Sequence, residues 1–396
     1  MAQTGYGGGD GLAHTPPTAD SAVKGQDGVA ASTGSTATAT APITPLKIDV
    51  VVGSYNYGRY LRAALDSALS QSYPHVRVIA VDDGSTDDSP QILRSYGDAI
   101  VPVLKENGGQ ASAMNAGFAM VEGDVVIFLD ADDMLNPQIA ERVAEAVLAH
   151  PDAAKIQWRL AMTHADGTAS GQVKPPRHLP LPQGDMRLAE LTFPFDITWI
   201  ATSGNAFPVG VLRQIMPIPE EGYEIGADYY LQHLPPLLGP VVSLDVIGGY
   251  RRIHDANAYE QAWDAGLDLS HIHLTIAKAR VTDRELEKLA VRLGIDERPA
   301  ARLSVSDLAN RLISLRFDRD RHTCPGDTRA ALAVAGFQAA RRRFDVHPTM
   351  RAVFCAWFLA TATVPRPAAL KLARWFMFPE QRPTVNRFLK PLHRGS

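Results

Sequence analysis

Cysteine is nearly missing from this chain of 396 residues, which contains only Cys324 and Cys355. Two thiols cannot build a disulfide framework, so we expect a reducing, cytoplasmic environment. Long apolar runs are also missing, because the best candidate, residues 352–364, has 13 residues, whereas an ordinary membrane-spanning helix needs about 20. A net charge of only −4 argues against a general nucleic-acid-binding protein.

Large apolar residues are almost lacking in residues 1–46, which are rich in Gly, Ala, Ser, Thr and Pro. Such a composition buries too little apolar surface to fold, so we predict a disordered N-terminal segment. The segment has neither the basic start nor the apolar centre of a signal peptide, so export is not indicated. The chain as a whole has 45% hydrophobic and 21% charged residues, which is typical of a globular protein, and its length suggests two or three folding units.

A regular alternation of strand and helix patterns begins at Lys47. Strand patterns cover residues 47–53, 76–83, 98–107 and 124–130, and helical patterns cover residues 60–71, 87–97, 110–123 and 137–150. Strands and helices that alternate with short connections predict an α/β fold with a mostly parallel sheet flanked by helices. Ligands bind beyond the carboxyl ends of such strands. We therefore expect the segments GSYN, DDGSTD and DADD, which follow three of the strands, to line a crevice.

Three carboxylates, Asp130, Asp132 and Asp133, end the strand pattern of residues 124–130. One interpretation is that they form a turn or cap the next helix. However, like charges at this spacing repel unless a cation or a pKa shift relieves them. A metal site at this edge of the sheet is therefore the competing hypothesis.

Four segments carry a resemblance to a known family: VVVGSYNYGRYLRAALDSALSQSY, VIAVDDGSTDDS, ENGGQASAMNAGF and GDVVIFLDADDMLNP. In this order and spacing, over residues 47–137, they resemble the nucleotide-binding half of the family 2, inverting glycosyltransferases with the GT-A fold. The segments TSGNAFPVGVLRQIMPIPE, EIGADYYLQHLPPLLG and GGYRRIHDANA are similar to the acceptor half of that family, over residues 138–258. The resemblance thus implies a GT-A (Rossmann-like) domain over residues 47–258.

The activity that the resemblance implies is the transfer of a single sugar from a nucleotide-diphosphate sugar donor to a hydroxyl of a glycan or lipid-linked acceptor. The pathway that it suggests is bacterial polysaccharide or glycoconjugate synthesis. Transfer of this type is inverting and depends on a divalent cation, Mn²⁺ or Mg²⁺, which neutralises the phosphates. Asp132 matches the principal metal ligand of the family, and His254 is a candidate to complete the metal shell. Asp130 would lie nearer the donor ribose or sugar, and we expect Asp133 to cap the loop.

Donor contacts are expected from the first two loops and from the Gly-rich segment. Tyr55 can stack on a nucleobase, and Asp83 can accept a hydrogen bond from a ring N–H. Gly108 and Gly109 permit a close approach, and the helix that begins near Gln110 would direct its N–H groups toward an anion. The predicted donor-binding residues are Tyr55, Asn56, Asp83, Ser85, Gly109, Asn115 and Asp130. For Asn115, an interior polar group without ligand contact is an equal alternative.

An inverting transfer also needs a general base, and Asp228 matches the Asp of the Glu-Asp motif of the family. Ala227 stands where the family has Glu, and Glu224 is the alternative base. A helix N-cap is the structural alternative for Asp228. On the acceptor side we expect Trp199, as a platform under a sugar ring, and Asn205.

Residues 259–396 match no family motif and show helical periodicity, so we predict an appended helical region. From residue 341 onward it carries eleven Lys or Arg against two Asp or Glu, a balance of +9. Two interpretations stay open, namely packing on the catalytic half and peripheral contact with an anionic membrane surface. For the whole chain, the alternatives to a transferase are a non-catalytic nucleotide-sugar-binding scaffold and a sugar nucleotidyltransferase.

Overall fold

A computed structural model of the protein describes residues 45–254, 267, 269–295 and 303–378. The disordered segment predicted over residues 1–46 lies almost entirely outside the described residues, as does the end of the basic tail after residue 378. Pro45 to Ser396 belong to one compact unit.

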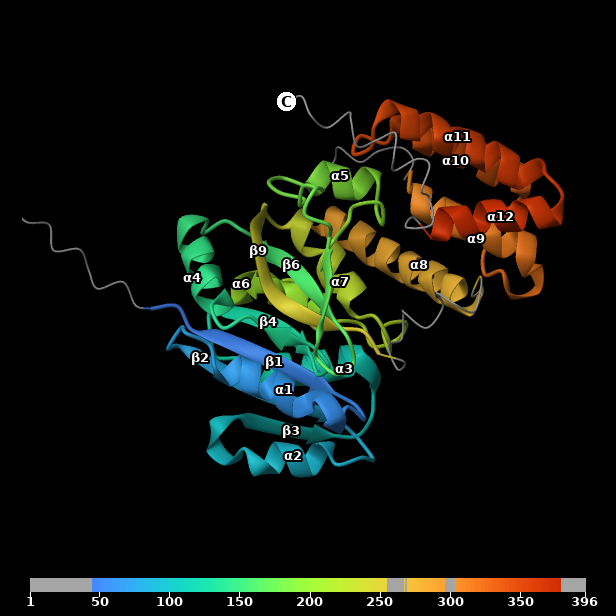
Figure 1. The fold of residues 1–396 in the computed structure, drawn as a ribbon. Coiled ribbons are helices and arrows are strands. Elements are labelled where there is room, and N and C mark those ends of the chain that lie inside the picture. The colour runs from blue at the N-terminus through green and yellow to red at the C-terminus, as the bar shows by residue number, and fades with distance from the viewer. Residues whose placement is uncertain (1–44, 255–266, 268, 296–302, 379–396) are drawn as a thin grey trace, which may run out of the picture. The chain divides into compact units, whose positions relative to one another are not determined.

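One sheet runs through the described part of this unit (Figure 1). Its path is β3-β2-β1-β4-β8-β6-β9-β5, and β7 pairs with β6. The strands are β1 (Ile48–Ser54), β2 (Val76–Asp83), β3 (Val101–Lys105), β4 (Val125–Asp130), β5 (Met134–Leu135), β6 (Lys155–Thr163), β7 (Ala169–Lys174), β8 (Asn205–Pro208) and β9 (Val241–Arg252).

The predicted parallel arrangement is found over the first four strands, since β1 pairs in parallel with β2 and β4, and β2 with β3. Beyond β4 the sheet is mixed, because β8 runs antiparallel to β4 and to β6. A short connection between β6 and β7 also returns the chain in the antiparallel sense, which needs no crossover helix. The α/β class is confirmed, with a mixed sheet where a mostly parallel one was expected.

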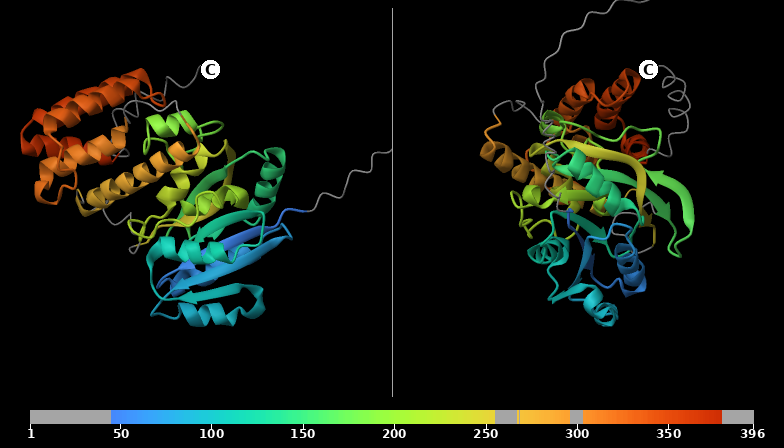
Figure 2. Two further views of the ribbon diagram at one scale, coloured as in Figure 1. Left: turned by 180° about the vertical axis from the view of Figure 1, so that it is seen from behind. Right: turned by 90° about the vertical axis from the view of Figure 1, so that its left-hand side faces the viewer.

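Helices cover both faces of the sheet because the buried strands alternate their side chains between two cores (Figure 2). In β1, Val50 and Val52 face one core and Val51 faces the other. The helices that pack on the first core are α1 (Gly58–Leu69), α2 (Ser89–Ser95) and α4 (Ile139–Ala149). Those that pack on the second core are α3 (Gly109–Ala119), α6 (Val209–Leu212) and α7 (Asp228–His233). The short α5 (Arg187–Thr192) lies between β7 and β8 in the chain. Each fully buried Val or Leu contributes about 1.5–3 kcal/mol.

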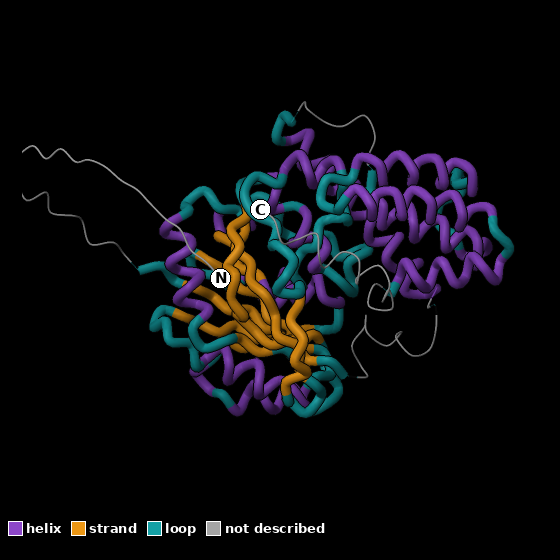
Figure 3. Tube along the Cα trace, turned by 45° about the horizontal axis from the view of Figure 1, so that its top comes forward, coloured by secondary structure: helices purple, strands orange, loops and turns teal. Residues whose placement is uncertain are grey.

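The predicted helical region follows the sheet and has a third core of its own (Figure 3). Its described helices are α8 (Leu269–Arg292), α9 (Val305–Phe317), α10 (Arg329–Arg342), α11 (Pro348–Thr363) and α12 (Arg366–Met377). Helix α8 joins the two parts, because Ile272 and Ile276 lie in the helical core while Leu286 and Leu289 lie in the second core of the sheet.

The aromatic residues of residues 352–364 pack inside this helical core. Trp357 and Phe358 of α11 are buried in this core, among residues of the helical region itself. Among the described helices we find none with the length and apolar character needed to cross a bilayer.

Asp196 links the acceptor-side segment to the helical region. Its carboxylate accepts hydrogen bonds from the N–H groups of Val305 (2.7 Å) and Ser306 (2.8 Å), the first two residues of α9. Arg343, which follows α10, lies 3.7 Å from the same carboxylate. A negative charge at a helix N-terminus is stabilising, so this buried contact anchors α9 to the segment before β8.

We expect Gly336→Val to destabilise the protein. A Cβ atom at Gly336 of α10 would overlap the ring of Phe358, which is fully buried and cannot move aside. Overpacking of this kind costs about 1–3 kcal/mol. Urea denaturation of the parent and variant measures the loss.

Gly210→Val is the matched control, because Gly210 is also helical and a Cβ there meets nothing within 4 Å. An equal loss of stability in both variants would mean that helix propensity, and not the contact with Phe358, sets the effect.

Candidate active site

A pocket of about 540 Å³ opens at the carboxyl ends of β1, β2 and β4, a size that suits a small-molecule ligand. It is lined by residues after β1 and β4, by the start of α3, by residues 224–226 and Asp228, and by Arg251 of β9. The crevice predicted from the strand order is therefore present at that edge of the sheet.

Asp133 is buried at the base of this pocket and is held by two hydrogen bonds. Its carboxylate accepts from the hydroxyl of Ser203 (2.7 Å) and from the backbone N–H of Arg252 (3.0 Å). Both partners come from segments far away in the chain, so Asp133 fastens the loop after β4 to β9. Its carboxylate is engaged inside the protein, in keeping with a structural role.

The two residues predicted as metal ligands lie together. Nε2 of His254 is 3.0 Å from Oδ2 of Asp132. The imidazole is oriented by Tyr60, whose ring centroid is 4.7 Å from that of His254 at an interplanar angle of 30°. An oxygen and a ring nitrogen at this separation can both reach one divalent cation.

Asp130 and Asp228 face the same pocket from opposite halves of the domain. Burial, together with the negative charges of Asp132 and Asp228, raises the pKa of Asp130 to about 7. Burial also raises the pKa of Asp228, and the charges of Lys278 and Arg251 oppose that rise. Asp228 is the first residue of α7, whose N-cap is Ala227, so the structural alternative of an N-cap role for Asp228 is not found.

Asp83 and Gly109 line the pocket, but the N–H groups at the start of α3 already have hydrogen-bond partners within the protein. The carboxylate of Asp83 accepts hydrogen bonds from Lys105 (2.6 Å) and from the N–H of Gly109 (2.8 Å). The N–H groups of the next two residues of α3 bond to the carbonyls of Glu224 and Tyr223. The prediction that these N–H groups are directed at a bound anion is therefore wrong for this conformation. Gly109 has φ +86°, and a Cβ there would approach the backbone of Glu224 to 2.7 Å.

Of the remaining predicted donor residues, Tyr55 lines the pocket and is 46% exposed, as a stacking residue must be. Asn56 and Ser85 instead join their two loops, because the N–H of Asn56 donates to the hydroxyl of Ser85 (2.8 Å). Asn115 exchanges two hydrogen bonds of 2.8 Å with the backbone of Ile218. None of these last three is among the residues that line the pocket in the described chain.

Trp199 and Asn205 also lie outside the pocket lining. The indole N–H of Trp199 donates to Glu190 (3.0 Å), and Nζ of the buried Lys155 lies 4.2 Å from the ring centroid of Trp199. The amide of Asn205 donates to backbone carbonyls of the preceding turn, including that of Ala201 (2.7 Å). Both side chains instead bond to the segment before β8 and its neighbours.

Gln110 is a pocket residue that the sequence analysis did not single out. Its Oε1 accepts from the N–H groups of Gly226 (2.7 Å) and Ala227 (3.0 Å), and its Nε2 lies 3.4 Å from Oδ1 of Asp130. Gln110 thus connects Asp130 to the turn that presents Asp228. A lone Gln gives no signal of this role, because Gly226 and Ala227 lie more than a hundred residues later in the chain.

Comparison with known proteins agrees with this geometry. Residues 49–191 match the model of the family described as glycosyl transferase family 2. An uncharacterized glycosyltransferase of Nostoc sp. is 32% identical over 259 residues, which cover 64% of this chain and 78% of that protein. The chain therefore belongs to glycosyltransferase family 2 and is a glycosyltransferase.

Two solved structures show a more distant likeness. A structure of TarS from S. aureus in complex with UDP-GlcNAc is 16% identical, with a TM-score of 0.47 and coverage of 83% of this chain and 90% of that one. A structure of the mannosyltransferase PcManGT from Pyrobaculum calidifontis, in complex with GDP-Man and Mn²⁺, is 17% identical, with a TM-score of 0.45 and coverage of 86% and 83%.

The neighbouring carboxylates Asp132 and Asp133 are expected to respond differently to substitution. Asp133→Ala leaves the buried hydroxyl of Ser203 and the N–H of Arg252 without their acceptor, which costs about 1–3 kcal/mol for each group. Asp132→Ala removes one of the like charges that crowd Asp130 and should change stability by less than half as much. Urea denaturation of both variants, without added metal, measures this difference, and equal losses would contradict it.

Proposed function

We propose that this glycosyltransferase is inverting and metal-dependent, and that it moves a single sugar from a nucleotide-diphosphate sugar to an acceptor hydroxyl in bacterial polysaccharide or glycoconjugate synthesis. The observation that carries the proposal is the meeting of Asp130, Asp132 and Asp228 around one pocket that also contains Arg251. Two of these carboxylates end a strand of the nucleotide-binding half, and the third begins a helix of the acceptor half. The pocket therefore joins a donor side to an acceptor side.

The donor set suits a hard divalent cation. Asp132 and His254 would hold it, since Oδ2 and Nε2 are 3.0 Å apart, and both Mn²⁺ and Mg²⁺ accept carboxylate oxygens as ligands. A bound cation would supply charge neutralisation for the donor diphosphate. Arg251, which lines the same pocket, adds a fixed positive charge for the same phosphates.

Asp228 is the proposed general base. In a single in-line displacement, the bond between the acceptor oxygen and the sugar carbon forms as the bond from that carbon to the phosphate oxygen breaks. The acceptor proton passes to the carboxylate of Asp228, which the side chain of Gln232 orients with a hydrogen bond of 2.8 Å. Burial raises the pKa of Asp228, which makes the carboxylate a stronger base than an exposed Asp.

Ala227 occupies the position at which the Glu-Asp motif has Glu. It is fully buried in the second core of the sheet and donates its N–H to Gln110. The loss of Glu at this position removes a side chain next to the base and leaves Asp228 itself in the pocket. A catalytic role is therefore favoured over a non-catalytic scaffold.

Nucleotide binding is expected to require both metal and Asp132. Calorimetric titration of the parent with UDP, GDP and dTDP, each with and without Mn²⁺, should show one nucleotide that binds only with the cation. Asp132→Ala should weaken that binding at least about tenfold, because His254 and the donor phosphates alone would hold the cation poorly.

Asp133→Asn serves as the control in this titration, since its amide oxygen can still accept from the N–H of Arg252 and its NH₂ group can donate to the hydroxyl of Ser203. It should bind nucleotide as the parent does. Failure of every nucleotide to bind the folded parent would contradict the proposed donor site.

Asp228→Asn should lower kcat by about 10²–10⁴-fold, the usual contribution of a general base, with little change in nucleotide affinity. Release of nucleoside diphosphate from the donor selected by titration measures turnover. The active form of Asp228 is ionised, so kcat/KM should fall as the pH is lowered through its raised pKa, at a higher pH than for an ordinary Asp.

Glu224→Gln is the matched control for the base, because Glu224 also lines the pocket and is the alternative carboxylate. It should keep turnover close to that of the parent. If instead Glu224→Gln is inactive while Asp228→Asn is active, Glu224 is the base; parental turnover in both variants contradicts a carboxylate base altogether.

A further inference from the structure

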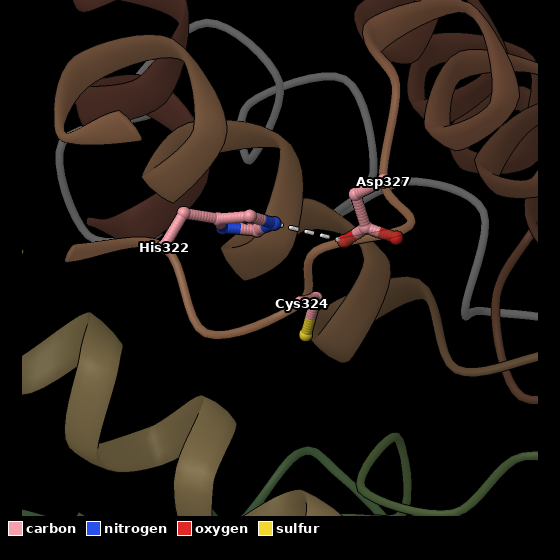
Figure 4. Close-up of side chains that lie close together, drawn as sticks. All are labelled: His322, Cys324 and Asp327. Carbon is pink, nitrogen blue, oxygen red and sulfur yellow. Dashed lines mark hydrogen bonds and ion pairs between the residues drawn. The ribbon is translucent and has the colours of Figure 1, made fainter. Parts of the chain in front are cut away.

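A group of three metal-binding residue types lies in the helical region, far in sequence from the pocket. His322, Cys324 and Asp327 belong to the connection between α9 and α10 (Figure 4). One ligand atom from each, namely a ring nitrogen, the sulfur and a carboxylate oxygen, lies within 4.8 Å of the other two. Cys324 is 9% exposed, so the group is partly shielded from water.

The local sequence brings these side chains together. Pro325 and Gly326 occupy the middle of a turn in which the N–H of Asp327 donates to the carbonyl of Cys324 (3.0 Å), and both residues favour such a turn. The turn places the side chains of Cys324 and Asp327 near that of His322, whose Nε2 is 3.1 Å from Oδ2 of Asp327.

The imidazole of His322 and the carboxylate of Asp327 each have a further hydrogen-bond partner. The hydroxyl of Ser314 lies 2.9 Å from Nδ1 of His322, which fixes the ring with Nε2 toward Asp327. Nε of Arg311 donates to the carboxylate of Asp327 (2.9 Å). Metal-bound histidines and carboxylates usually have supporting hydrogen bonds of this kind.

Asp327 shares its paired cation, Arg311, with a second carboxylate, and Nη1 of Arg280 donates to the carbonyl of Thr323 beside the group. Arg311 lies between two carboxylates, since it also contacts Asp307 (3.3 Å). Oδ1 of Asp307 is buried and has no hydrogen-bond partner among the described residues. One guanidinium therefore balances two carboxylates, and a further cation next to Asp327 would be attracted electrostatically.

We propose that His322, Cys324 and Asp327 bind one Zn²⁺ ion, with water as the fourth ligand. Ligand atoms on a tetrahedral zinc ion are separated by roughly 3.3–3.5 Å, and the observed separations of up to 4.8 Å require only small side-chain rotations to reach this. On binding, the thiol of Cys324 releases its proton to water. His322 keeps a proton on Nδ1, which donates to the hydroxyl of Ser314, and its Nε2 is then free to bind the metal.

The site would have a structural role that is independent of glycosyl transfer. Cys324 belongs to the core of the helical region, so a bound ion would fasten the connection between α9 and α10 to that core. An ion that binds only the folded chain raises stability in proportion to the logarithm of its concentration over its dissociation constant.

Cobalt titration of the full chain tests the site, because Co²⁺ replaces Zn²⁺ in such sites and a bound thiolate gives a near-ultraviolet charge-transfer band. The parent should develop this band with one equivalent of Co²⁺ and lose it when Zn²⁺ is added. Cys324→Ser should abolish the band. Cys355→Ser, which changes the other buried thiol, should keep it, and so should Asp132→Ala in the pocket.

Thermal unfolding provides the second measurement. Zn²⁺ should raise the Tm of the parent and of Cys355→Ser but not that of Cys324→Ser or His322→Gln, while all four should unfold at similar temperatures in the presence of a chelator. A parent that develops no thiolate band, or a band that persists in Cys324→Ser, would overturn the proposal and leave a hydrogen-bonded contact of His322, Asp327 and Arg311. These readouts need no activity, so they do not depend on the proposed transfer reaction.

Discussion

Repulsion between carboxylates at the end of β4 is the constraint on which the arrangement of the pocket depends. Asp133 accepts two hydrogen bonds from distant segments, yet burial and the charges of Asp132 and Asp130 raise its pKa well above the usual range. Asp132 lies 3.0 Å from the imidazole of His254. Burial beside Asp132 and Asp228 also raises the pKa of Asp130, and the charge of Arg251 opposes that rise. Three adjacent acids thus have three environments, and together they draw the end of β9 and the segment before β8 around the end of β4.

Many other polar groups near the pocket also form hydrogen bonds within the protein, because a buried polar group without a partner is costly. The carboxylate of Asp83 and the first N–H groups of α3 satisfy one another and the carbonyls of residues 223 and 224. Gln110 then connects this helix to the turn before Asp228. The end of β2 and the segment before α7 are therefore joined by hydrogen bonds through the start of α3, and not only by the shared sheet.

Among the residues that the structure describes, those of the helical region support the pocket and do not line it. Asp196 accepts hydrogen bonds from the start of α9, and α8 packs in both the second core of the sheet and the helical core. Lys278 of α8 also acts on the pKa of Asp228. A region that matches no motif thereby influences the proposed base through a buried charge.

The sequence by itself determined the α/β class, the first four strands and their order of appearance, the appended helices and the family, because periodicity and short motifs depend on residues close in the chain. It also indicated Asp130, Asp132, Asp228 and Tyr55, which line the pocket. Only the tertiary structure decided that Asn56, Ser85, Asn115, Trp199 and Asn205 lie outside the pocket lining, that the sheet is mixed beyond β4, and that Gln110 bridges two carboxylate-bearing segments. The physical reason is that a polar side chain bonds to whichever partner the fold brings near it, and these partners are distant in sequence.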